Sequence, residues 1–133
     1  MTGGQTAYRV LVVDDDDDGV ATWSLIFQFA GFDVRAASDG PSALRLVDDF
    51  RPHAIVLDIG LPKLNGCEVA QRVRANPACD GVVLIALTGY GEDADHARSR
   101  EVGFDHHLVK PTDPDVLCQL LERHAASRHL IRP

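Results

Sequence analysis

Five short apolar runs recur along the chain, each bounded by polar or turn-forming residues. We expect them to form β-strands over residues 9–13, 33–37, 54–58, 82–88 and 107–109. Between them, apolar residues at three- and four-residue spacing predict helices over residues 20–30, 42–50, 66–75, 92–102 and 114–126. This alternation predicts a doubly wound α/β fold, in which helices cover both faces of a five-stranded parallel sheet and right-handed crossovers join the strands.

The length of 133 residues fits one domain with a substantial buried core. We expect residues 8–126 to form that domain, with residues 1–7 as a disordered or tag-like N-terminus and residues 127–133 as a C-terminal tail. No apolar stretch approaches the roughly 20 residues that span a bilayer, so we expect no membrane insertion.

The formal net charge of −7 argues against direct binding of nucleic acid, because sequence-independent binding depends on Lys and Arg that neutralise phosphates. Cys67, Cys79 and Cys118 are odd in number and widely spaced, so we expect reduced thiols. The first ten residues lack the basic start and long apolar stretch of a secretory signal. These features together predict a cytoplasmic protein.

Polar side chains stand at the ends of four predicted strands, namely Asp14 and Asp15, Asp58, Thr88, and Lys110. The carboxyl ends of parallel strands lie along one sheet edge, so we expect these side chains to converge. Three carboxylates in a small cleft repel one another unless a cation lies among them, and hard oxygen ligands suit Mg²⁺. In such a site Asp58 can act as a nucleophile toward a phosphoryl group, whose charge Mg²⁺ and Lys110 would counter.

These residues resemble the motifs of a response-regulator receiver domain, and the similarity covers roughly residues 8–126. The matching stretches are Val10–Asp15, Leu57-Asp58-x-x-Leu61-Pro62-x-x-x-Gly66, Thr88 and Lys110-Pro111. That family places its hydroxyl residue about thirty positions after the phosphoacceptor, as Thr88 follows Asp58 here. The resemblance implies the flavodoxin-like strand order 2-1-3-4-5. It also implies a phosphoacceptor signalling domain rather than an enzyme, with a histidine kinase or histidine phosphotransfer protein as partner.

By the same resemblance, Asp58 is the phosphoacceptor, and Asp15 and Asp58 are direct Mg²⁺ ligands. Asp14 would hold the metal through water, and the backbone carbonyl of Gly60 would be a further ligand. Phosphorylation adds about −1.5 to −2 charge. It is expected to change the surface made by the helix over residues 92–102, the strand over residues 107–109 and the helix over residues 114–126. The segment Gly103–Pro111 is, by resemblance, common in receivers attached to hybrid histidine kinases.

Thr88 is expected to move toward the phosphoryl group on Asp58, and Lys110 is expected to form an ion pair with that group. His107 departs from the family pattern, which usually carries Tyr or Phe as a side chain that swings inward with the threonine. Two interpretations of His107 stay open. In the first, the imidazole takes the place of the aromatic side chain in an altered, pH-sensitive switch. In the second, His107 is an exposed side chain on an edge strand beside His106.

The aspartate run allows two other interpretations. Asp14-x-Asp16-x-Asp18 fits the first half of an EF-hand loop, but the twelfth position, which should be Glu, is Leu25. The aspartates also resemble those of haloacid-dehalogenase-like phosphatases, with Asp14 or Asp16 as nucleophile, although that mechanism gives Asp58 no role. A phosphorylation-independent interaction module is the remaining alternative.

The first predicted helix carries a second apolar stripe beyond its core face. Ala21, Leu25 and Phe29 recur at four-residue spacing along it. The stripe favours docking against the helix pair of a histidine kinase or phosphotransfer protein, and ordinary scattered surface apolar residues are the alternative interpretation.

Overall fold

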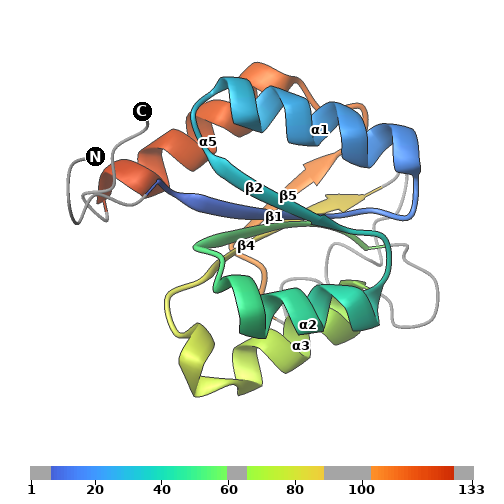
Figure 1. Ribbon diagram of the computed structural model, residues 1–133, viewed down its shortest axis with the longest axis vertical. Coiled ribbons are helices and arrows are strands. Elements are labelled where there is room, and N and C mark those ends of the chain that lie inside the picture. Colours follow the sequence, from blue (N-terminus) through green and yellow to red (C-terminus); the bar gives the residue numbers. More distant parts are fainter. Residues whose placement is uncertain (1–6, 60–65, 89–102, 128–133) are drawn as a thin grey trace.

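The computed structural model describes residues 7–59, 66–88 and 103–127, which form two helical layers around one sheet (Figure 1). In chain order, the elements are β1 (Arg9–Val13), α1 (Asp17–Phe29), β2 (Asp33–Ala37), α2 (Gly40–Phe50), β3 (Ala54–Asp58), α3 (Gly66–Ala75), the 3-10 helix η1 (Pro77–Cys79), β4 (Val83–Thr88), β5 (His106–Val109) and α5 (Pro114–Ser127). The predicted helix over residues 92–102 lies outside the described residues.

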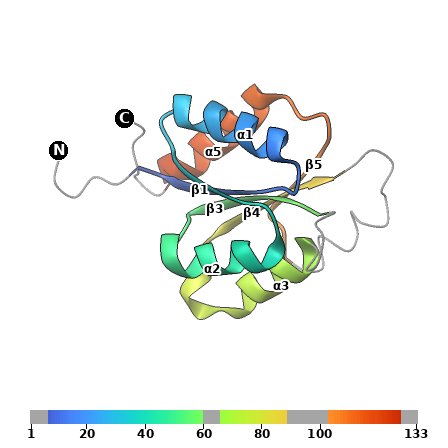
Figure 2. The ribbon, with the colours of Figure 1, turned by 45° about the vertical axis from the view of Figure 1, so that its right-hand side comes forward.

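The strands are all parallel and lie in the order β2-β1-β3-β4-β5, which confirms the predicted doubly wound sheet. Helices α1 and α5 cover one face, and α2 and α3 cover the other (Figures 1 and 2). The central strands are almost continuously apolar because helices bury both of their faces.

Two apolar clusters, one on each face of the sheet, make up the core. The cluster beneath α1 and α5 contains Tyr8, Phe27, Leu117 and Leu121. The cluster above α2 and α3 contains Leu11, Ile55, Leu57, Val69 and Leu84. Successive residues of each strand point to opposite faces, so one apolar run contributes to both clusters.

The predicted start of α1 at Val20 is wrong, because the helix begins three residues earlier. The side chain of Asp16 caps it by accepting a hydrogen bond from the backbone N–H of Asp18 at 3.3 Å. Asp17 and Asp18 then lie in the first turn, where the helix dipole favours negative charge. An aspartate before a helical pattern is an ordinary N-cap signal, so the sequence did contain the information for this start.

The start of α2 also differs, at Gly40 rather than Ser42, because Asp39 caps the helix through a 2.8 Å hydrogen bond from the Ser42 N–H. The three cysteines, all within the described residues, form no disulfide, as predicted. Burial raises the pKa of the Cys79 thiol, and Asp48 adds to the rise, so its reactive thiolate is disfavoured. Within the described ranges, no helix has the length and apolar character needed to cross a bilayer.

Candidate functional site

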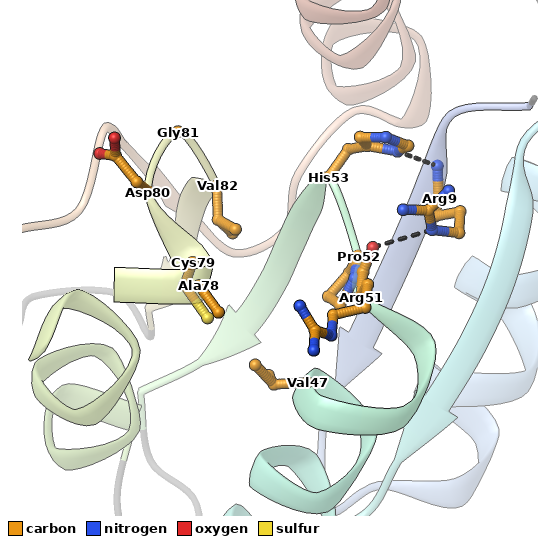
Figure 3. Close-up of a pocket in the computed structure, with 10 residues that line it drawn as sticks. All are labelled: Arg9, Val47, Arg51, Pro52, His53, Ala78, Cys79, Asp80, Gly81 and Val82. Atoms are coloured by element: carbon orange, nitrogen blue, oxygen red, sulfur yellow. Dashed lines mark hydrogen bonds between the residues drawn. The ribbon is translucent and has the colours of Figure 1, made fainter. Parts of the chain in front are cut away.

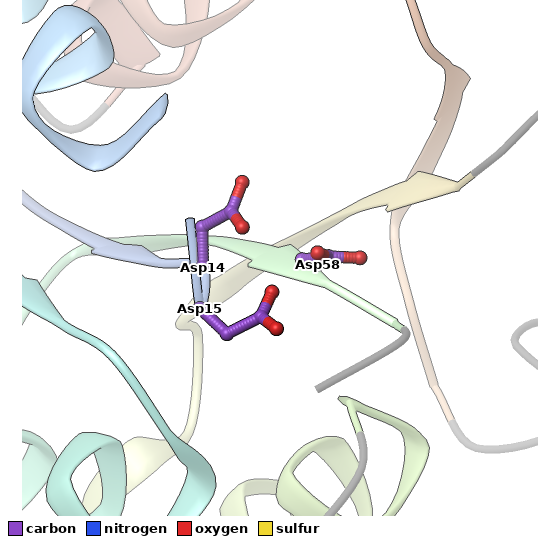
Figure 4. A group of neighbouring side chains, drawn as sticks. All are labelled: Asp14, Asp15 and Asp58. Atoms are coloured by element: carbon purple, nitrogen blue, oxygen red, sulfur yellow. The ribbon is translucent and has the colours of Figure 1, made fainter. Parts of the chain in front are cut away.

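The ends of β1 and β3 bring the predicted acidic residues together. Val13 lies opposite Leu57 in the sheet, so Asp14 and Asp58, the residues that follow, meet at the carboxyl edge. Asp14, Asp15 and Asp58 each offer a carboxylate oxygen, and these three oxygens lie within 4.8 Å of one another (Figure 4). The structure thus places the three predicted metal-ligating side chains in one cluster.

The three carboxylates differ in exposure. Asp14 is only 5% exposed, and its Oδ1 accepts a 3.0 Å hydrogen bond from the backbone N–H of Asp16. Asp58 is half-buried and Asp15 is exposed. Figure 4 shows the carboxylates of Asp14 and Asp15 leaving opposite sides of the end of β1, with Asp58 beside them at the end of β3. The cluster therefore combines one fixed, buried carboxylate with two that solvent can reach.

Among the described residues, Lys110 places a positive charge beside this cluster. Its Nζ lies 3.3 Å from Oδ2 of Asp58 and 3.7 Å from Oδ2 of Asp14. Its backbone N–H donates to the carbonyl of Thr88 at 2.8 Å, which fixes the chain after β5 against the end of β4. The Lys110 side chain is 40% exposed, so solvent partly screens both ion pairs.

The electrostatics of the cluster favour a bound cation. Burial raises the pKa of Asp14, and the Asp58 carboxylate adds to the rise, while the Asp16 N–H and the Lys110 ammonium oppose it. Burial alone would lower the pKa of Lys110, but the carboxylates of Asp58 and Asp14 outweigh it and raise that pKa. Within the described ranges, the ammonium of Lys110 thus faces the three carboxylates of the cluster. The donor set fits a hard divalent cation such as Mg²⁺, which would relieve the remaining repulsion.

Thr88 and His107 lie next to each other beside this cluster. Thr88 is 1% exposed, and its Oγ1 lies 3.2 Å from Nε2 of the half-buried His107. The preceding residue, His106, reaches the opposite face of the sheet, where its Nε2 lies 2.8 Å from Nε2 of His124 on α5. No local sequence pattern predicts the His106–His124 pair.

Arg74 on α3 holds the chain that enters β5. Its guanidinium donates to the carbonyls of Gly103 at 2.9 Å and Val82 at 2.7 Å, and to Oδ2 of Asp105 at 2.7 Å. The same Asp105 oxygen accepts from the backbone N–H of Leu84 at 2.8 Å. These bonds fix the start of β5 against β4, and so help to place His107 and Lys110 farther along the chain.

Gly66 explains why α3 can begin so close to the end of β3. A Cβ at this position would lie 2.6 Å from Cα of Ile59 and 2.8 Å from the carbonyl oxygen of Asp58. The Gly66 N–H also donates to the carbonyl of Ile59 at 3.0 Å. The glycine thus permits direct backbone contact behind Asp58. Gly60, the predicted backbone ligand, lies outside the described residues.

A cavity of about 600 Å³ adjoins the acidic cluster, with Asp14 and Lys110 on one side and Trp23 and Ile26 of α1 on the other. A second cavity, of about 330 Å³, lies at the amino-terminal ends of the strands (Figure 3). There Nε of Arg9 donates a hydrogen bond to the backbone carbonyl of Arg51, the C-cap residue of α2. The second cavity is remote from the convergent carboxylates, so the site chemistry belongs to the first.

Comparison with known proteins agrees with this geometry. The family model of the response regulator receiver domain matches residues 10–122. The transcriptional regulatory protein PrrA of Mycobacterium tuberculosis is 41% identical over 123 residues, which cover 92% of this chain and 51% of that protein. PhoP of Bacillus subtilis, an alkaline phosphatase synthesis transcriptional regulatory protein, is 36% identical over 80% of this chain and 43% of its own length. The chain thus spans about half the length of these curated relatives.

Solved structures show the same architecture. The chemotaxis protein CheY4 of Vibrio cholerae is 30% identical with a TM-score of 0.83, over 89% of this chain and 98% of that chain. A CheY-like receiver domain protein from Methanospirillum hungatei JF-1 is 26% identical with a TM-score of 0.82, over 93% and 98% of the two chains. Sequence family, strand order and the acidic strand ends agree, and the chain belongs to the response regulator receiver domain family of two-component systems.

Proposed function

We propose that Asp58 accepts a phosphoryl group from a histidine kinase or a histidine phosphotransfer protein, in a Mg²⁺-dependent reaction. The observation that carries this proposal is the cluster of three carboxylates with the Lys110 ammonium 3.3 Å from Asp58. The domain then acts as a phosphoacceptor that assists its own phosphorylation and dephosphorylation, rather than as a classical enzyme.

In this reaction an oxygen of Asp58 forms a bond to phosphorus while the bond from phosphorus to the donor imidazole breaks. The electron pair of that bond leaves with the donor nitrogen. Lys110 balances charge on the phosphoryl oxygens from its position beside Asp58. The hydroxyl of Thr88 donates a hydrogen bond to the transferred group. Phosphorylation then changes the surface formed by β5, α5 and the predicted helix over residues 92–102, which lies outside the described residues.

The residues that would hold Mg²⁺ are Asp15 and Asp58 directly, Asp14 through water, and Gly60 through its backbone carbonyl. When bound, the ion supplies positive charge to the phosphoryl oxygens and to the attacking carboxylate. Asp14 suits an indirect role because one of its oxygens is already engaged by the Asp16 N–H.

The geometry argues against the phosphatase alternative. Asp16 is the N-cap of α1, and it does not belong to the carboxylate cluster found among the described residues. Asp14 is buried and tied to the backbone, whereas Asp58 is more open to an incoming donor. A phosphorylation-independent interaction module does not explain why Asp14 is buried beside Asp58, an arrangement that raises the pKa of Asp14.

Incubation with Mg²⁺ and acetyl phosphate tests the proposal, with phosphoryl incorporation measured by intact mass. We expect one phosphoryl group on the wild type, none on Asp58→Asn, and none after Mg²⁺ is chelated. Asp16→Asn is the matched control, because asparagine caps helices as well as aspartate and should leave labelling intact. Loss of labelling in Asp16→Asn with retention in Asp58→Asn would favour the phosphatase, and an unlabelled wild type would favour the interaction module.

We further propose that the exposed apolar stripe of α1 docks against the helices of the phosphodonor protein. Ala21 is exposed, Leu25 is 56% exposed and Phe29 is 90% exposed, so the stripe lies on the surface as expected. Leu25→Asp should slow phosphotransfer from a cognate kinase and leave labelling by acetyl phosphate unchanged. An unchanged rate from the kinase would contradict the docking role.

A further inference from the structure

A side-chain contact joins the end of β4 to β5. Oγ1 of Thr88 lies 3.2 Å from Nε2 of His107, and Thr88 is 1% exposed, so water has little access to this hydroxyl. His107 lies opposite Ala86 in the sheet, two residues before Thr88, and the two side chains therefore lie on the same face. The diagonal reach across two parallel strands brings imidazole and hydroxyl together.

Thr88 is also the neighbour of the phosphoacceptor. Asp58 lies opposite Leu87, so the Thr88 that follows stands just beyond the Asp58 carboxylate at the same sheet edge. The backbone carbonyl of Thr88 accepts from the Lys110 N–H at 2.8 Å, which ties the same residue to the chain that carries the ammonium. Thr88 thus lies at the same strand-end edge of the sheet as the phosphoryl group that we propose on Asp58.

The direction of the contact between Thr88 and His107 decides what the hydroxyl can do. A hydroxyl has one proton to donate, and an imidazole nitrogen donates when protonated and accepts when it is not. If Nε2 of His107 accepts, the Thr88 proton is taken up by that bond. If Nε2 donates, Oγ1 accepts, and the Thr88 proton stays available for a different acceptor.

We propose that His107 is a positioning residue for the phosphoryl group: in the phosphorylated protein its Nε2–H donates to Oγ1 of Thr88 and directs the Thr88 proton to a phosphoryl oxygen. This inference rests on the proposed function, because it takes the group on Asp58 as the acceptor. The imidazole keeps one proton throughout. Where that proton starts on Nδ1, it passes to solvent and a proton from solvent takes its place on Nε2.

A chain of two hydrogen bonds that ends on an anion is stronger than an isolated neutral bond, because each bond polarises the next. A phenylalanine side chain at this position would fill a similar space. A phenyl ring has no donor, so the chemistry at this position differs from that of a phenylalanine even where the volume does not.

Two variants separate hydrogen bonding from space filling. His107→Phe keeps an aromatic ring without a donor, and His107→Gln keeps a donor without the ring. We expect His107→Phe to weaken binding of beryllium fluoride, a stable phosphoryl mimic, by roughly three- to tenfold in the presence of Mg²⁺, which corresponds to one hydrogen bond. His107→Gln should bind close to the wild type. A purely space-filling role predicts the reverse order, and that order would overturn the proposal.

Imidazole nitrogen NMR of the whole chain gives the direct readout. With Mg²⁺ and beryllium fluoride bound, we expect a protonated Nε2 on His107. His53 is an internal reference, because its Nδ1 accepts from the Arg9 N–H at 2.9 Å and its neutral form must carry the proton on Nε2. An unprotonated Nε2 on His107 in the bound state would overturn the positioning role alone. Failure of Asp58 to take up phosphoryl from acetyl phosphate would overturn the proposed function, and this inference with it.

Discussion

Replacing Gly66 by alanine tests how closely the start of α3 supports the phosphoacceptor. Gly66 is the first residue of α3, so alanine gains at most the about 1 kcal/mol by which it is favoured over glycine in a helix interior. The added Cβ would instead lie 2.6 Å from Cα of Ile59, where ordinary contacts begin at 3.4 Å. Backbone atoms must therefore separate by about 0.8 Å, and overpacking of this kind costs about 1–3 kcal/mol.

The balance predicts that Gly66→Ala lowers the free energy of unfolding by up to about 2 kcal/mol, measured by urea denaturation. Because the Cβ also meets the Asp58 carbonyl at 2.8 Å, the carboxylate should shift and phosphorylation by acetyl phosphate should slow about tenfold or more. Gly19→Ala in α1 is a comparison for stability alone, because its Cβ would meet side-chain oxygens of Asp14 and Asp16 at 3.3 Å rather than backbone atoms. A Gly66→Ala protein as stable and active as the wild type would refute this reasoning.

Three further predictions concern stability, each measured by urea unfolding. The pKa of Asp14 is raised in the native state, so the folded protein binds the Asp14 proton more tightly than the unfolded chain does. Without Mg²⁺, the free energy of unfolding should therefore fall as the pH rises from the unfolded-state pKa of Asp14 toward its native pKa. Asp14→Asn should abolish that fall. Arg74→Met should lower the free energy of unfolding by about 1–3 kcal/mol, because it removes three hydrogen bonds of the guanidinium. One of them, to Asp105, is also an ion pair, which is partly exposed. Phe27→Ala should cost about 3–5 kcal/mol and Phe29→Ala less than about 0.5, because only Phe27 is buried; equal losses would contradict the burial of α1.

The sequence predicted the strands well because each is an apolar run that ends at a polar or turn-forming residue. Observed and predicted strand bounds agree within one residue, for example at Val83 and His106. Helix starts were less predictable. Apolar periodicity marks the buried face of α1. Its first turn depends instead on the Asp16 cap, and this turn contains acidic residues that show no apolar period.

The convergence of Asp14, Asp58 and Lys110 could be predicted because a parallel sheet places all strand ends at one edge. The orientation of His107 could not. Strand alternation sets only which side chains share a face, and the register between β4 and β5 is needed to place His107 beside Thr88.

Contacts between residues far apart in the chain were also beyond the sequence. Arg74 and Asp105 lie on α3 and before β5, and His106 and His124 lie on β5 and α5. None of these residues stands out by local pattern, because Arg and His are ordinary surface residues until the packing of two elements brings them together.

The location of the phosphoryl adduct decides whether Asp58 is the phosphoacceptor. Protein phosphorylated by acetyl phosphate and Mg²⁺ is cleaved under acidic conditions, where an acyl phosphate survives, and the modified peptide is sequenced by mass spectrometry. We expect a single base-labile phosphoryl group on Asp58. An adduct on Asp14 or Asp16, or stoichiometric labelling of Asp58→Asn, would contradict it.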